Sequence, residues 1–348
     1  MKEKNKIVFF ASGDFAIETF TYLVENGENV VGLVTTNDYT KYHKKTLREL
    51  AKDYRLPTHI VKTEKVEDDE WLPDFLKRLN ADIFCVISFK KLPESIIKMA
   101  KKCAFNIHAS LLPLLRGADP VHWAIRYGFN ETGLSAILLN DKIDCGDILL
   151  NKIVSISDKD DYETLFKKLS KECVDFTYDV LNEVLTKDDF RVRVIKQPSF
   201  SLYEAPKTNR DKITTAELAN FYGSESTSLN PTENLFRASE GFLFTLHVKG
   251  KDKNCKNVEF KDKIKIYRVK ASEEIAKEAE TYPLEDIVAA PLVKTDGKTF
   301  IKFTYWTIWY YIETIQLVGK KKMSVKDFLN GYRHFDYDDL EIRLVFED

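Results

Sequence analysis

Residues 83–108 read IFCVISFKKLPESIIKMAKKCAFNIH, and this stretch decides the fold of the first half of the chain. Ile83–Phe89 and Cys103–His108 are apolar runs of the length and residue types that β-strands favour. Pro93–Lys102, between them, is predicted to be a helix, because proline is tolerated in the first helical turn. A strand, a helix and a second strand in this order predict parallel strands in one sheet, with the helix packed on its face.

The same alternation of strand and helix signals continues on both sides of this stretch. Further strands are predicted at Lys6–Phe10, Val30–Val34, Leu134–Leu139 and Ile148–Ile156. Helices are predicted at Asp14–Glu25, Thr46–Tyr54, Trp71–Leu79, Val121–Tyr127 and Asp161–Leu185. We therefore expect an α/β domain over residues 1–188, with a doubly wound, mostly parallel sheet and helices on both faces.

The second half of the chain has a different pattern. Residues 189–213 carry charge and proline with few periodic signals, and we interpret them as a linker. Alternating and aromatic-rich runs then predict a smaller, OB-like β-barrel domain of about five strands over residues 214–333. These runs are Leu243–Val248, Lys263–Val269 and Phe300–Gln316. Residues 334–348 are expected to form a C-terminal extension.

The overall composition excludes several classes of protein. Lys and Arg number 53 and Asp and Glu number 55, so the net charge of −2 provides no overall attraction to nucleic acid. No apolar segment reaches the roughly 18 residues that a membrane span needs. The five cysteines include no CxxC pair, which is typical of a reducing compartment, and we expect no metal site. We expect a cytoplasmic protein that is a monomer or a weak oligomer.

Three polar residues at the ends of predicted strands form the main candidate site. Asn106 and His108 are two apart, so on a strand they project from the same face. Asp144 lies in a Gly-containing loop after the strand-like run Leu134–Leu139. An amide, an imidazole and a carboxylate that converge could stabilise an oxyanion and move a proton at neutral pH. Taken singly, each has a structural interpretation: a loop cap, a polar gap-filler and a turn aspartate.

Other polar segments also have two interpretations. Residues 11–16 open a helix after a strand, but their single glycine is too few for a dinucleotide-binding loop, and a packing role is favoured. Arg116-Gly117 is either an anion contact or a cap. The basic loop with Lys41, Lys44 and Lys45 could grip a phosphate backbone or be a solvated surface loop. The same alternatives hold for Lys320-Lys321-Lys322.

The motif residues together resemble a known family. Asn106-Ile-His-Ala-Ser-Leu-Leu-Pro113, Arg116-Gly117 with Pro120, and Asp144-Cys-Gly-Asp147 are similar to the formyltransferase family that uses 10-formyltetrahydrofolate. Three further segments resemble the methionyl-tRNA formyltransferase branch of that family. They are FASGDFA at residues 10–16, SFKKLP at residues 88–93, and the stretch from Ile315 to Gly331.

The resemblance implies formyl transfer from 10-formyltetrahydrofolate to a primary amine, with the α-amine of initiator methionyl-tRNA as the acceptor. Asn106 and His108 would hold the oxyanion, and Asp144 would order His108 and a water and assist proton transfer. The implied folate-contacting residues are Ser88, Phe89, Lys90, Leu92, Ser110, Leu111, Leu112, Pro113, Leu139, Asn140 and Asp141. The implied tRNA-contacting residues are Lys41, Lys44, Lys45, Lys320 and Lys321.

Two departures from the family pattern leave the acceptor open. The loop Asn37–Thr46 is several residues shorter than the basic loop of the tRNA-dependent branch and lacks its arginines and glycines. Asp119 adds a negative charge where the family usually has alanine. An amino sugar nucleotide or another small amine is therefore an alternative acceptor. A folate- or RNA-binding protein without activity, and a hydrolase that releases formate, are further alternatives.

Overall fold

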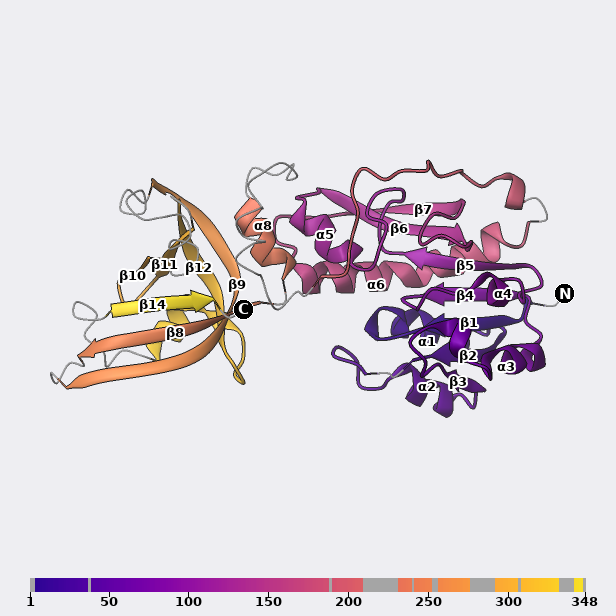
Figure 1. The fold of residues 1–348 in the computed structure, drawn as a ribbon, viewed down its shortest axis with the longest axis horizontal. Coiled ribbons are helices and arrows are strands. Elements are labelled where there is room, and N and C mark those ends of the chain that lie inside the picture. The colour runs from indigo at the N-terminus through magenta and orange to yellow at the C-terminus, as the bar shows by residue number, and fades with distance from the viewer. Residues whose placement is uncertain are drawn as a thin grey trace. The chain divides into compact units, whose positions relative to one another are not determined.

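The computed structural model describes residues 4–36, 39–187, 190–208, 231–239, 241–251, 256–275, 292–305, 308–331 and 341–346. The chain divides into two compact units. The first comprises Met1–Ala124, Asn130–Lys159 and Glu163–Lys207, and the second comprises Ile125–Phe129, Asp160–Tyr162 and Thr208–Asp348. Each unit contains its own sheet (Figure 1).

The first unit is built on a seven-stranded sheet with the order β3-β2-β1-β4-β5-β6-β7. Neighbours from β3 to β5 are parallel, whereas β6 pairs antiparallel with both β5 and β7. This confirms the prediction of a mostly parallel sheet. The strands are β1 (Ile7–Ala11), β2 (Val30–Thr35), β3 (Thr58–Ile60), β4 (Ile83–Ile87), β5 (Cys103–His108), β6 (Glu131–Leu138) and β7 (Ile148–Ser155).

Helices cover both faces of this sheet, which is why β1 is buried along its whole length. Val8 and Phe10 of β1 pack in a cluster with Leu72 and Leu76 of α3. Phe9 points to the opposite face, where its ring lies 5.4 Å from that of Phe20 in α1. The helical elements are η1 (Asp14–Ala16), α1 (Ile17–Glu25), α2 (Leu47–Asp53), η2 (Val66–Asp68), α3 (Leu72–Leu79), α4 (Glu94–Ile97), α5 (Pro120–Arg126), α6 (Tyr162–Asp179), η3 (Val180–Val184) and η4 (Phe190–Val192).

Two local elements of the first unit differ from the sequence prediction. The helix predicted over Pro93–Lys102 is only the single turn α4, because the next backbone amides bond elsewhere. Lys101 N donates to Ala81 O at 3.3 Å and Lys102 N to Asp82 O at 2.8 Å, which directs the chain into β5. The strand β3 was missed because its three residues are all half-buried and show no apolar alternation.

The second unit contains an antiparallel, barrel-like sheet with the order β10-β11-β12-β9-β8-β14, and β13 pairs with β12. Its described part therefore has seven strands, where about five were predicted. Part of the difference is the strand β14, which lies beyond the residues 214–333 to which the prediction applied. Strands and helices are α8 (Pro231–Ala238), β8 (Phe242–Lys251), β9 (Asn257–Ile275), β10 (Val293–Thr295), β11 (Ile301–Tyr305), β12 (Ile308–Leu317), β13 (Met323–Ser324), α10 (Val325–Asn330) and β14 (Glu341–Phe346).

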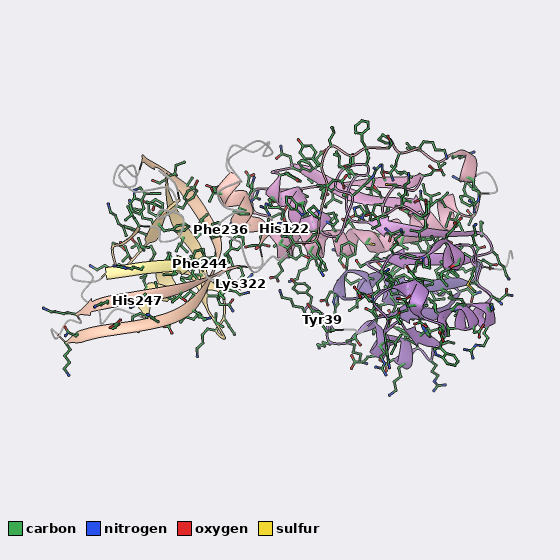
Figure 2. The ribbon with its side chains drawn as sticks, in the orientation of Figure 1. Tyr39, His122, Phe236, Phe244, His247 and Lys322 are labelled. Atoms are coloured by element: carbon green, nitrogen blue, oxygen red, sulfur yellow. The ribbon has the colours of Figure 1, made fainter. Side chains whose placement is uncertain are left out.

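The core of the second unit lies between α8 and the inner face of its sheet. Phe236 of α8 packs against Phe242 and Phe244 of β8, with ring centroids 5.1 and 6.4 Å away. Phe236 and Phe244 are labelled in Figure 2. The strand β14 lies within the expected C-terminal extension and pairs with β8 from Glu341 to Phe346. The other parts of that extension, 334–340 and 347–348, lie outside the described residues, as do 189 and 209–213 of the expected linker.

Candidate active site

The site is built around the carboxyl end of β5. Asn106 pairs in register with Val86 on one side and Ile137 on the other, and His108 is the last residue of the strand. The two side chains share a face of β5 because they are two residues apart. His108 is buried, with 6% of its surface exposed, whereas Asn106 is half-buried. The strand therefore presents an amide and a shielded imidazole from one face.

The two ring nitrogens of His108 have different surroundings. Nε2 lies 2.7 Å from the carbonyl oxygen of Leu115. A carbonyl oxygen only accepts hydrogen bonds, so Nε2 carries a proton and donates it. Nδ1 lies 3.6 Å from Oδ2 of Asp144, which is too long for a good hydrogen bond. Nδ1 is therefore the nitrogen that can engage a reacting group, and the Asp144 carboxylate can stabilise a positive charge on the ring.

The Asp144 carboxylate is oriented by the loop that follows β5. Its Oδ2 accepts a hydrogen bond from the backbone N–H of Gly117 at 3.0 Å. Gly117 has φ 125°, and a Cβ atom at this position would lie 2.4 Å from the carbonyl oxygen of Ala205. Only glycine fits both the backbone angle and this close approach. The glycine of the Arg116-Gly117 pair thus serves to bring an amide to Asp144.

Sequence reasoning missed one residue at this site, Gln197 of the expected linker. Its Nε2 donates to the carbonyl oxygens of Asp144, at 3.0 Å, and Gly146, at 2.6 Å. Its Oε1 accepts from Arg116. No local pattern in an extended, aperiodic segment marks such a side chain. Asp144 and Gln197 are also far apart in the sequence, so the sequence alone does not indicate that they lie close together in the fold.

The residues after β4 differ in their freedom to contact a ligand. Ser88 is exposed and has φ 51°, and its carbonyl oxygen accepts from Ser12 N at 3.0 Å. This point is where the strand order reverses between β1 and β4, the position at which doubly wound sheets bind ligands. Lys90 instead uses its ammonium to hold the carbonyl oxygens of Thr63 and Glu64, at 2.6 and 3.0 Å.

Apolar residues of the two segments that follow β4 and β6 pack against one core cluster. Phe89 and Leu139 are half-buried and pack against the same core cluster, whereas Leu92 is part of that core. Asn140 and Asp141 are exposed, and Oδ1 of Asn140 accepts from Lys142 N at 2.9 Å. Phe89 and Leu139 thus keep a partly exposed apolar surface that a planar ring could cover.

The Ser110–Pro113 segment is held by hydrogen bonds to the residue that follows it, Leu114, and to Ser135 of β6. Ser110 Oγ donates to Leu114 O at 2.6 Å, and Ser135 Oγ donates to Ser110 O at 2.7 Å. Ser110 and Leu112 are buried, and Leu112 packs in an apolar cluster with residues of β6 and β7. Leu111 and Pro113 are half-buried. Ser110 and Leu112 therefore shape the loop, while Leu111 and Pro113 are the members with surface to offer.

The lysine loop is organised by Asp14, which sequence reasoning did not identify. The Asp14 carboxylate accepts from the backbone amides of Lys41, at 2.8 Å, and Tyr42, at 3.2 Å, and from His43 Nδ1 at 3.0 Å. Burial raises the pKa of Asp14, but the hydrogen bonds from His43, Thr40 and the two amides outweigh it and hold the pKa below its ordinary value.

The predicted tRNA-contacting lysines differ in their surroundings. Lys45 is paired with Asp53 at 2.7 Å, whereas Lys44 is exposed at the surface of the loop. Tyr39, 74% exposed, lies on the same loop (Figure 2), of which residues 37–38 are outside the described part. In the second unit, Lys320 and Lys321 are exposed in the turn after β12.

The described residues contain no group of three or more His, Cys, Asp or Glu side chains placed to hold a metal ion. In the same part of the chain, the helices lack the combination of length and apolar character that crossing a bilayer requires.

Comparisons with known proteins bear on the chemistry of this site. Residues 5–181 match the family model described as formyl transferase. A methionyl-tRNA formyltransferase of Parabacteroides distasonis is 29% identical, over 95% of this chain and 97% of the relative. One of Azobacteroides pseudotrichonymphae is 30% identical, over 94% of this chain and 96% of the relative.

The chain also has a fold in common with solved structures. The sugar 3N-formyl transferase WlaRD, determined in the presence of dTDP and 5-N-formyl-THF, has a TM-score of 0.56 at 15% identity, over 92% of this chain and all of that one. The N-formyltransferase of Helicobacter canadensis has a TM-score of 0.54 at 14% identity, over 89% and 99% of the two chains.

Proposed function

This chain belongs to the formyltransferase family, and we propose that it transfers a formyl group from 10-formyltetrahydrofolate to the α-amine of initiator methionyl-tRNA. The relatives that carry the name methionyl-tRNA formyltransferase are similar over nearly the whole of both chains, the second unit included. The observation that carries the proposal is the His108–Asp144 pair, whose Nδ1 and Oδ2 atoms lie 3.6 Å apart beside Asn106 at the end of β5.

Each of these residues has a role in the proposed reaction. The amine attacks the formyl carbon, a new C–N bond forms, and the carbonyl oxygen gains negative charge. The amide of Asn106 would donate to this oxygen, and so would Nδ1 of His108 in the imidazolium form, in which both ring nitrogens carry a proton. Donors of this kind contribute about 10²–10³ in rate. The bond to N10 of the folate then breaks, and N10 takes up a proton as the amine loses one. Asp144 would assist this proton transfer directly or through a water.

The residues at the switch point of the sheet suit the folate donor. We assign the pterin to the segment that begins at the exposed residue Ser88 and to residues 139–144, with Phe89 and Leu139 as the apolar wall. A flat heteroaromatic ring with polar edges needs an apolar surface and backbone hydrogen-bonding groups, and this region offers both.

One feature of the chain favours a second candidate acceptor. The short loop between β2 and α2 leaves less chain to reach into an RNA acceptor stem, so an amino sugar nucleotide is the alternative. Its amine would attack the same formyl carbon. The two candidates therefore differ in the acceptor and share the chemistry.

A parallel formylation assay tests the proposal. The purified protein is given 10-formyltetrahydrofolate and one of three acceptors: charged initiator methionyl-tRNA, charged elongator methionyl-tRNA, or a dTDP-linked amino sugar. We expect formylmethionyl-tRNA from the initiator species and much less product from the other two. Formylation of the amino sugar alone would replace the proposed acceptor with the alternative. Formate release without product would indicate a hydrolase.

A further inference from the structure

We propose that Gln197 is a positioning residue for Asp144, with Arg116 fixing the orientation of its amide. This inference rests on the proposed function, because it explains how the loop that carries Asp144 is held in place for formyl transfer. It adds to the site a residue from the segment that the sequence presents as a linker.

The first step concerns the side chain of Arg116, a residue that is 6% exposed. Its Nε and Nη2 donate to Gln197 Oε1 at 3.2 and 2.8 Å, and Nη2 also donates to Pro198 O at 2.8 Å. An arginine side chain offers only donors and stays charged, so the group it faces must be an acceptor. This fixes the oxygen of the Gln197 amide toward Arg116.

The second step follows from that orientation. With Oε1 turned toward Arg116, the NH₂ end of Gln197 faces the carbonyl oxygens of Asp144 and Gly146, at 3.0 and 2.6 Å. A flipped amide would place NH₂ against a cation and an oxygen against two carbonyl oxygens. The side chain therefore connects a buried positive charge to the backbone on both sides of Cys145 in one orientation only.

The third step concerns the backbone of Asp144, whose φ of 51° lies in the left-handed region. Residues with side chains adopt this conformation at a cost and keep it when surrounding bonds hold it. Gln197 donates a hydrogen bond to the carbonyl oxygen of Asp144, and Gly117 N donates one to the Asp144 carboxylate at 3.0 Å. Together they hold the residue at both ends and place Oδ2 3.6 Å from His108 Nδ1.

The linker segment is itself hydrogen-bonded to the loop after β5. Leu115 N donates to Tyr203 O at 2.7 Å, and Ala205 N donates to Arg116 O at 2.7 Å. Gln197 therefore reaches Asp144 from a segment that is bonded to the same loop as Gly117. Asp144 is therefore held by the loop after β5, through Gly117, and by the linker segment, through the side chain of Gln197.

Two substitutions separate positioning from simple support of Arg116. Gln197→Leu removes both the acceptor for Arg116 and the donors to the loop. Gln197→Glu keeps an acceptor for Arg116 and, as an ionised carboxylate, provides no donor to the carbonyl oxygens of Asp144 and Gly146. Lys196→Ala is the matched control, since Lys196 pairs with Asp147 of the same loop at 2.5 Å and is the chain neighbour of Gln197.

The experiment measures steady-state formylation by the full-length protein. Both Gln197 variants should lose about 10- to 100-fold in kcat, because a displacement of about 1 Å at a reacting group costs this much. KM for 10-formyltetrahydrofolate should change much less than kcat, since the apolar wall of Phe89 and Leu139 is untouched. The thermal midpoint of Gln197→Glu should fall less than that of Gln197→Leu, which leaves buried Arg116 without its acceptor, and Lys196→Ala should keep normal kcat.

A second readout does not depend on the acceptor. Cys145 is half-buried between the two carbonyls that Gln197 holds. Its alkylation rate, followed by peptide mass spectrometry, should rise several-fold in both Gln197 variants and stay unchanged in Lys196→Ala. If the wild type does not formylate initiator methionyl-tRNA, the proposed acceptor fails while this readout still tests the positioning.

Three results would overturn the inference. They are normal kcat in both Gln197 variants, recovery of kcat in Gln197→Glu but not in Gln197→Leu, and unchanged Cys145 alkylation in both. The second result would mean that Gln197 serves only to satisfy Arg116.

Discussion

His108 Nδ1 lies 3.6 Å from Asp144 Oδ2, while His108 Nε2 is committed to the carbonyl oxygen of Leu115 at 2.7 Å. The hydrogen bond of Nε2 therefore fixes the orientation of the His108 ring, and Nδ1 is available beside the Asp144 carboxylate. A second His–Asp pair in the same unit, His59 Nε2 with Asp69 Oδ2 at 2.9 Å, leaves no such gap. The proposed reaction uses the first pair, in which Nδ1 is not held by the carboxylate.

The first prediction compares these two histidines. His108→Ala should reduce kcat for formyl transfer by at least about 10², because it removes a donor to the developing oxyanion. His59→Ala, at the edge strand β3, should leave kcat within about twofold of the wild type. Steady-state kinetics with circular dichroism as a folding check measures both. Equal losses in the two variants would contradict the assignment of His108.

The second prediction concerns Gly117. Gly117→Ala should destabilise the protein by roughly 2 kcal/mol or more, since the Cβ meets the carbonyl oxygen of Ala205 at 2.4 Å and φ is 125°. It should also lower kcat, because the amide that orients Asp144 moves. Gly27→Ala is the control: its φ is 72° with nothing within 4 Å of the new Cβ, so it should cost stability alone. Full activity in Gly117→Ala would argue against the amide's role.

The third prediction tests the basic loop. Replacing Lys41 and Lys44 by alanine should weaken tRNA binding. It should also reduce the salt slope, which is the steepness with which the logarithm of the binding constant falls with the logarithm of salt concentration, by about 0.7–0.9 for each phosphate that the loop no longer neutralises. Lys45→Ala should change the slope less, because Lys45 is paired with Asp53 at 2.7 Å. Binding titrations over a series of salt concentrations measure these slopes. An unchanged slope in the double variant would count against phosphate binding by this loop.

The fourth prediction concerns pH and Asp14. Because its pKa is held below the ordinary value, ionised Asp14 stabilises the fold above the unfolded-state pKa, and this contribution is lost as pH falls through the folded-state pKa. Asp14→Asn should remove this acid-side dependence and cost roughly 1–2 kcal/mol at neutral pH. Urea unfolding across the acid range measures it. A pH dependence equal to the wild type's in Asp14→Asn would contradict the anchoring role.

Much of the architecture could be predicted from the sequence because it depends on apolar runs that local spacing reveals. The strand β4 is a continuous apolar segment, β5 is mostly apolar, and a capping box at Thr46 precedes the helix α2. The strand β3 is half-buried at the sheet edge and leaves no such pattern. The short helix α4 ends where tertiary hydrogen bonds take over its amides.

The site divides in the same way. Asn106 and His108 are close in sequence and on one strand, so their common face followed from spacing alone. Other contacts of the site join segments that are far apart in the chain. They are the hydrogen bond from Gln197 to Asp144 and the hydrogen bonds that Asp14 accepts from the lysine loop. Nothing in the local composition of either segment indicates its partner. Such contacts are set by how the sheet and the linker fold back, which only the three-dimensional structure reveals.

The most direct test of the central claim is the single-turnover rate of formyl transfer to charged initiator methionyl-tRNA, with the wild type beside Asp144→Asn. The asparagine keeps the size of the side chain and removes its charge and its proton-accepting capacity. We expect product from the wild type and a rate at least about 10² lower in the variant. A variant that formylates at nearly the wild-type rate would contradict the account.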